Sequence, residues 1–111
     1  MKFSESLKKN DDFRRVYRKG RSRANQNLVL YTYKNDLERN RLGISVSKKV
    51  GNSIVRHHMT RLIREVYRLH EDEFNIGFDL VVVVRNGNKK TKFTDVEPYF
   101  LELANLQRIM K

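Results

Sequence analysis

The sequence contains no cysteine, which excludes disulfide bonds, a thiol nucleophile and thiolate metal sites. It also lacks any apolar run close to the roughly 20 residues that a membrane-spanning helix needs. The N-terminal residues have no continuous apolar core of the kind found in signal peptides. Together these absences favour the reducing cytoplasm, and we expect a cytoplasmic protein with no membrane partner.

Acidic residues are scarce relative to basic ones. The 111 residues include 24 Lys and Arg but only 13 Asp and Glu, which gives a formal net charge of +11. Such a charge bears on partners rather than on fold. It favours RNA or DNA, with an anionic membrane surface as the lesser option, and the plain alternative is a basic protein without a polyanionic partner. Length and an apolar content of 39% predict one folded domain over residues 1–111.

The first quarter of the chain predicts an arm, a short helix and a loop. Residues 1–9 are expected to form a flexible basic arm. Asn10 can cap a helix that Gly20 ends, with two acids in its first turn. Residues 21–27 are polar and basic, and they predict a loop.

Three later segments have the composition of strands. Apolar residues alternate over 28–33 and 42–47, and the short polar turn between them favours an antiparallel pair. Residues 78–85 are almost continuously apolar, which predicts a central strand covered on both faces. The capping box Thr94-x-x-Glu97 predicts a final helix that ends near residue 110.

Residues 53–69 predict an amphipathic helix with an apolar and a basic side. At about 100° per residue, the apolar stripe consists of Val55, Met59, Leu62, Ile63, Val66 and Leu69. Burial of this stripe in the core leaves the opposite side for a ligand, and that side carries His57, Arg61, Arg64 and Arg68, with Arg56 at its margin.

The segment 41–68 that contains this helix is the strongest functional signal. Its only acid is Glu65, and its basic residues are Arg41, Lys48, Lys49, Arg56, Arg61, Arg64 and Arg68. An arginine guanidinium can donate two parallel hydrogen bonds to the oxygens of one phosphate. We therefore interpret the segment as a phosphate-binding surface. The alternative is a solvated helix face, although such faces normally mix their charges.

Aromatic residues among basic ones supply a second candidate site. Phe13, Tyr17, Tyr31 and Tyr33 are placed to stack on the bases of a single strand. The alternative is ordinary core packing, which is as good an interpretation for Phe13. Tyr31 lies on the less aliphatic face of its strand, which favours exposure.

No active site is evident in the sequence. His57 and His58 are adjacent and cannot point together from a helix, so they do not predict a metal site. No pair of carboxylates is positioned for acid–base chemistry. The hypotheses from the residues alone are an RNA-binding subunit of a larger enzyme, a standalone RNA or DNA binding module, and a metal-dependent nuclease. None of them requires a small-molecule substrate.

Several segments resemble the protein subunit of bacterial ribonuclease P. The basic-helix signature is carried by Lys48-Lys49-Val50-Gly51-Asn52-Ser53-Ile54-Val55-Arg56 and Arg61-Leu62-Ile63-Arg64-Glu65. The family's first helix and strands are matched by Asp12-Phe13, Val16-Tyr17, Gly20, Ala24-Asn25, Leu28-Val29-Leu30-Tyr31 and Arg41-Leu42-Gly43-Ile44-Ser45-Val46-Ser47. One departure is that His57, His58 and Thr60 replace the family's usual Asn, Arg and a basic residue, which reduces the positive charge there.

The resemblance implies both a fold and a function. The fold is an α+β single-domain sandwich, with a four-stranded mixed sheet, three helices and an uncommon left-handed βαβ crossover. The implied partners are the catalytic ribonuclease P RNA and precursor tRNA, whose 5′ leader is removed by hydrolysis with the help of Mg²⁺ held mainly by RNA. The protein itself is expected to carry no catalytic residue and no metal.

The resemblance also implies two groups of binding residues. The residues implied to contact the leader of precursor tRNA are Phe13, Tyr17 and Tyr31. Contacts to the catalytic RNA fall to Lys48, Lys49, Asn52, Arg56, Arg61, Arg64 and Arg68.

Overall fold

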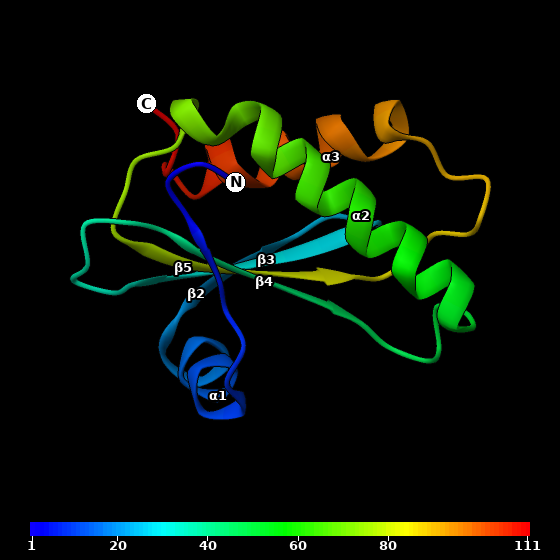
Figure 1. The fold of residues 1–111 in the computed structure, drawn as a ribbon, viewed down its shortest axis with the longest axis horizontal. Helices are drawn as coiled ribbons and strands as arrows, with labels where there is room; N and C mark the ends of the chain where they lie inside the picture. The colour runs from blue at the N-terminus through cyan, green and yellow to red at the C-terminus, as the bar shows by residue number, and fades with distance from the viewer.

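The computed structural model describes the whole chain, Met1–Lys111, as a mixed five-stranded sheet with three α-helices (Figure 1). Across the sheet the strands run in the order β1-β4-β5-β3-β2. Along the chain the elements are β1 (Glu5–Ser6), α1 (Asn10–Lys19), β2 (Arg21–Ala24), β3 (Leu28–Lys34), β4 (Arg41–Val46), α2 (Ser53–His70), the 3₁₀ turn η1 (Glu71–Glu73), β5 (Phe78–Val84) and α3 (Phe93–Leu106).

β5 occupies the centre of the sheet, as its apolar run predicts. It pairs parallel with β4 on one side and antiparallel with β3 on the other. The expected antiparallel pair of β3 with β4 is therefore wrong, because β5 lies between them. A strand that is apolar on both faces gains most where both of its edges are hydrogen-bonded and both faces are covered. Leu80, Val81 and Val82 are all fully buried.

The two edge strands are the ones that the residue pattern did not predict: it predicted three strands and the family resemblance implied four, whereas the sheet has five. Residues 21–24 were expected in a loop, but they form β2, which pairs antiparallel with β3. Every side chain of β2 is exposed, so no apolar alternation marks the strand in the sequence. The expected flexible arm is also wrong, because residues 5–6 form β1 parallel to β4 and Leu7 is buried.

The helices form one layer on each side of the sheet. α2 and α3 cover one face and α1 lies on the other (Figure 1). α2 connects β4 to its parallel neighbour β5. In Figure 1, β4 lies nearer the viewer than β5 and α2 lies above both, so the chain returns to the sheet by the left-handed crossover that the family implies.

The core lies mainly between the sheet and the α2–α3 layer. Met59, Ile63 and Val66 of the predicted stripe are buried there. Leu69 is a correction, because 53% of it is exposed while Tyr67 is completely buried. Tyr67 is one turn beyond Ile63, so the buried face of α2 is rotated toward Tyr67 and away from Leu69.

The helix ends differ from the expected ones in three places, one of which is the end of α3 at Leu106 rather than near residue 110. Asn52 caps α2 by accepting a hydrogen bond from the Val55 N–H. Asn10 is the first residue of α1 and not its cap. α3 starts earlier than predicted, because Asp95 accepts a hydrogen bond from the backbone N–H of Lys92.

Candidate nucleic-acid interface

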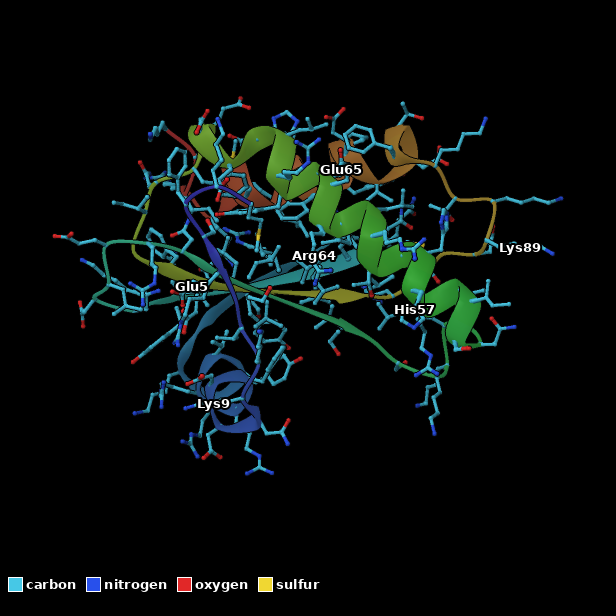
Figure 2. The ribbon with its side chains drawn as sticks, viewed as in Figure 1. Glu5, Lys9, His57, Arg64, Glu65 and Lys89 are labelled. Atoms are coloured by element: carbon cyan, nitrogen blue, oxygen red, sulfur yellow. The ribbon has the colours of Figure 1, made fainter.

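The basic side of α2 is exposed to solvent along most of the helix. His57, Arg61, Arg64 and Arg68 are all exposed. Figure 2 shows His57 near the N-terminal end of α2 and Arg64 further along the same helix. The predicted separation of an apolar and a basic side is therefore confirmed for these four residues.

The loop before α2 places two further cations beside this side. Lys48 and Lys49 occupy a turn closed by the Val50 N–H and the Ser47 carbonyl at 3.1 Å, and both are exposed. Gly51 is required next, because a Cβ there would lie 2.8 Å from the Cβ of Val55. The loop therefore turns tightly into α2 and keeps its lysines at the N-terminal end of the helix.

Two of the predicted RNA-binding arginines are held in different ways. Arg56 is half-buried, and its Nε is buried without a hydrogen-bond partner. Arg68 forms a paired ion contact with Glu65, at 2.5 and 3.0 Å, which lowers the pKa of the exposed Glu65 carboxyl. Arg68 must therefore exchange an existing partner to bind phosphate, whereas Arg56 has an unused donor.

The paired histidines have different environments. Nε2 of His58 lies 2.6 Å from the carbonyl oxygen of Thr91, so this ring ties α2 to the loop that follows β5. His57 is exposed and lines a hollow of about 450 Å³ together with Arg61 and Lys89. Figure 2 shows Lys89 on the loop beside the N-terminal end of α2. The sequence analysis did not single out Lys89, because this residue comes close to α2 through the fold alone.

The three predicted leader-binding residues lie together on the other face of the sheet. The ring centroids of Phe13 and Tyr17 are 6.3 Å apart, and those of Tyr17 and Tyr31 are 4.9 Å apart in an edge-on arrangement. Tyr17 is 40% exposed, and Phe13 and Tyr31 are half-buried against a small core. Ser45 and Val83, on the same face, are also half-buried, so no helix fully covers that part of the sheet.

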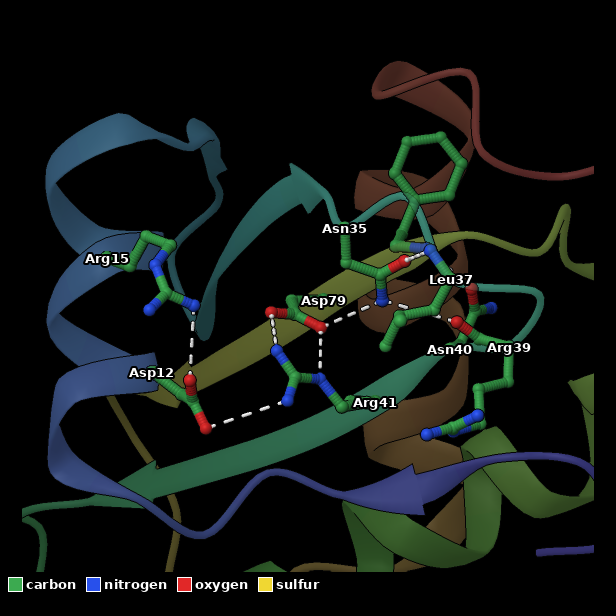
Figure 3. Close-up of polar contacts among 9 residues, drawn as sticks. Asp12, Arg15, Asn35, Leu37, Arg39, Asn40, Arg41 and Asp79 are labelled. Atoms are coloured by element: carbon green, nitrogen blue, oxygen red, sulfur yellow. Dashed lines mark hydrogen bonds and ion pairs between the residues drawn. The ribbon is translucent and has the colours of Figure 1, made fainter.

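An ion-pair network holds α1 and its aromatic residues against the sheet (Figure 3). Arg41 of β4 donates two hydrogen bonds of 2.7 Å to the completely buried Asp79 of β5. The third guanidinium nitrogen of Arg41 lies 3.6 Å from Asp12 of α1, which also pairs with Arg15 at 3.2 Å. The hydrogen bonds with Asp79 raise the pKa of Arg41.

A close backbone approach completes this contact. A Cβ on Gly43 would lie 2.6 Å from the ring of Phe13, so the ring rests directly on β4.

Nowhere in the chain do three His, Cys, Asp or Glu side chains converge as metal ligands. No helix has both the length and the apolar character that crossing a membrane requires.

Comparison with known proteins decides the family. A family model described as Ribonuclease P matches residues 1–108. The chain belongs to the ribonuclease P protein family. The ribonuclease P protein component of Lachnoclostridium phytofermentans is 51% identical over 107 residues, which cover 96% of this chain and 92% of that protein.

Solved structures of ribonuclease P proteins have the same fold. The Staphylococcus aureus protein matches with a TM-score of 0.86 and 34% identity, over 96% of this chain and 97% of that one. A mutant of the S. aureus protein, described as defective in mRNA degradation activity, matches with a TM-score of 0.85 and 35% identity, over 94% and 88%. Family membership makes this chain the protein subunit of the endoribonuclease that removes the 5′ leader of precursor tRNA.

Proposed function

We propose that the chain binds the two RNAs of the holoenzyme on opposite faces of its sheet. The catalytic ribonuclease P RNA occupies the basic side of α2 and its preceding loop, through Lys48, Lys49, Asn52, Arg56, Arg61, Arg64 and Arg68. The single-stranded leader of precursor tRNA occupies the aromatic set Phe13, Tyr17 and Tyr31. The protein thereby positions the leader while the RNA cuts, in the bacterial cytoplasm.

The observation that carries this proposal is the separation of two different chemistries by the sheet. The α2 side offers exposed guanidinium and ammonium groups, which neutralise phosphates without reading sequence. The α1 side offers neighbouring aromatic rings, which stack on unpaired bases. Stacking needs splayed single-stranded bases, which a leader supplies.

Magnesium enters the proposal through the RNA. Mg²⁺ prefers carboxylate oxygens and phosphates as ligands. No group of three His, Cys, Asp or Glu side chains is arranged to hold a metal ion, so we assign the ions to the catalytic RNA and its substrate. There they would activate the attacking water and stabilise the leaving oxygen.

Cleavage of precursor tRNA by the catalytic RNA, with and without the purified protein at low Mg²⁺, tests the proposal. We expect the protein to accelerate leader removal and the protein alone to be inactive. The absence of any acceleration would refute the proposal.

A second candidate function is suggested by the S. aureus mutant, whose description names mRNA degradation. Incubation of the protein alone with an mRNA fragment tests it. Cleavage that a chelator abolishes would support a nuclease activity without RNA, and an intact fragment would leave the holoenzyme role as the function.

A further inference from the structure

A hollow beneath the β5–α3 loop is separate from both groups of predicted residues. It has a volume of about 260 Å³ and lies between that loop, α3 and the start of β3. This is slightly below the roughly 300–1,000 Å³ of sites for drug-sized ligands, so it suits one small ring system. Its apolar part is formed by Leu28, Met59, Val96 and Tyr99.

Gly87 brings the loop backbone directly onto this floor. A Cβ at that position would lie 2.5 Å from the sulfur of Met59, so only glycine lets the loop lie this close to the methionine. Met59 is thereby covered and only 1% exposed, whereas Tyr99, which also lines the hollow, is half-buried and keeps part of its side chain accessible. Aromatic rings pack favourably against one another, so the hollow suits a flat aromatic group.

The rim of the hollow combines hydrogen-bonding groups with and without partners. Asn86 donates to the Gln26 carbonyl, and Asn88 accepts from the Lys90 N–H. The side-chain amide of Asn27 has no protein partner, and Asp95 uses only one carboxylate oxygen, for the Lys92 N–H. The amide oxygen of Asn27 and the free carboxylate oxygen of Asp95 can both accept hydrogen bonds, so they suit a ring whose edge carries two adjacent N–H donors.

Positive charge lies on one side of the hollow. The loop carries Lys89 and Lys90, and the basic hollow of His57 and Lys89 lies beyond its wall. The His58–Thr91 hydrogen bond forms part of that wall, since Thr91 lines one hollow and His58 the other. A ring in the first hollow and a phosphate in the second are the parts of a nucleotide.

We infer that this hollow binds one extruded nucleobase of the RNA held along α2, and that the base is a guanine, with its phosphate near Lys89 and His57. Guanine presents two adjacent N–H groups, which Asp95 and Asn27 can accept together. This inference rests on the proposed function, because the base belongs to the RNA that α2 binds.

The salt dependence of RNA affinity tests the inference. Asn27→Leu removes the amide and should weaken binding of the catalytic RNA about five- to fiftyfold, as expected for a lost base contact. The slope of log affinity against log salt should not change, because that contact is not ionic. Lys89→Ala should instead make the slope shallower by about 1. Asn105→Leu, at an exposed site on α3, is the matched control and should leave both quantities unchanged.

Base-specific footprinting with kethoxal, which modifies the N1 and N2 atoms of unpaired guanine, supplies the second measurement. The wild-type protein should protect at least one guanine, and Asn27→Leu and Asp95→Asn should each expose it. If the wild-type protein accelerates leader cleavage but both variants keep its affinity and footprint, the pocket inference is refuted and the proposed function stands. If the wild-type protein gives no acceleration, the proposed function itself fails.

Discussion

Tyr31 combines packing with a candidate binding role in one side chain. It is half-buried against the small core under α1, and its ring meets the edge of Tyr17. The sequence left packing and stacking open for the aromatic residues, and the structure gives Tyr31 contacts that allow both. A half-buried ring is held in one orientation, so it loses little entropy when a base stacks on it.

Tyr31→Ala should lower the affinity for precursor tRNA relative to mature tRNA, because only the precursor carries a leader. A stacked base is worth roughly 1–3 kcal/mol. The dissociation constant of mature tRNA divided by that of precursor tRNA should therefore fall by about tenfold. The measurement is equilibrium binding of both RNAs by the reconstituted holoenzyme. Phe78→Ala is the control, since Phe78 is also a half-buried aromatic residue of the sheet but packs against the core on the α2–α3 side. An unchanged ratio for Tyr31→Ala would show that the residue serves packing alone.

α1 depends on ion pairs for its position because it packs on the sheet through few buried residues. Of its side chains only Val16 is buried. The link from Asp79 through Arg41 to Asp12 therefore fixes the element that carries Phe13 and Tyr17.

Arg41→Met should destabilise the protein by about 3 kcal/mol, the low end for breaking a buried ion pair. The low end applies because a fifth of the Arg41 side chain is exposed and Asn35 still donates to Asp79. Urea denaturation provides the measurement. Arg39→Met is the control, because the exposed Arg39–Glu5 pair is worth only about 0–1 kcal/mol. Equal effects of the two substitutions would contradict the role of the buried pair.

The C-terminal end of α2 is joined to α3 by His70. Its ring nitrogens lie 2.7 Å from a carboxylate oxygen of Glu97 and 2.5 Å from one of Glu73. These hydrogen bonds, chiefly the one to Glu97, raise the pKa of His70 above its ordinary value. The contribution to stability is therefore fully present below about pH 6.5, the unfolded value, and is lost as the pH rises through the folded pKa.

His70→Asn should consequently lower the free energy of unfolding more at pH 6 than at pH 9, by about 1 kcal/mol or less at pH 6. Chemical denaturation at both values gives the comparison. His57→Asn, at an exposed site without an ion pair, should show no such difference. A loss that is independent of pH would mean that the contact is not ionic.

Across the whole molecule, the net charge of +11 attracts RNA without selecting a face. Arg61→Ala combined with Arg64→Ala should reduce the slope of log affinity against log salt for the catalytic RNA by about 2, as expected for two phosphate contacts. Lys34→Ala combined with Lys111→Ala removes the same charge from exposed sites outside α2. That pair should lower affinity less and leave the slope nearly unchanged. Equal slopes for the two double variants would refute a specific α2 surface.

The sequence predicted the interior of the fold better than its edges. The apolar run of β5 and the alternation of β3 identified strands because burial imposes a pattern on side chains. β2 is held by backbone hydrogen bonds with every side chain exposed, so it left no pattern to find. The place of β5 between β3 and β4 depends on pairing over long separations, which local periodicity does not record.

The candidate sites followed the same division. The exposed side of α2 could be predicted because helical periodicity places Arg61 and Arg64 together. The approach of Tyr17 to Tyr31 joins different elements, and it was suggested by the family resemblance rather than by spacing. The exchange of Leu69 for Tyr67 shows that periodicity gives a stripe but not its precise rotation against a neighbouring layer.

The placement of α1 and α2 on opposite sides of the sheet has an electrostatic consequence for two polyanions held at once. The molecule extends over 36 × 27 × 24 Å, so phosphates at opposite outer surfaces can lie about three screening lengths apart at physiological ionic strength, where that length is about 8 Å. Negative charge arriving at one side is therefore scarcely felt at the other. The sheet keeps the two RNAs apart, so the protein can bind both at once without the repulsion that direct contact between them would bring.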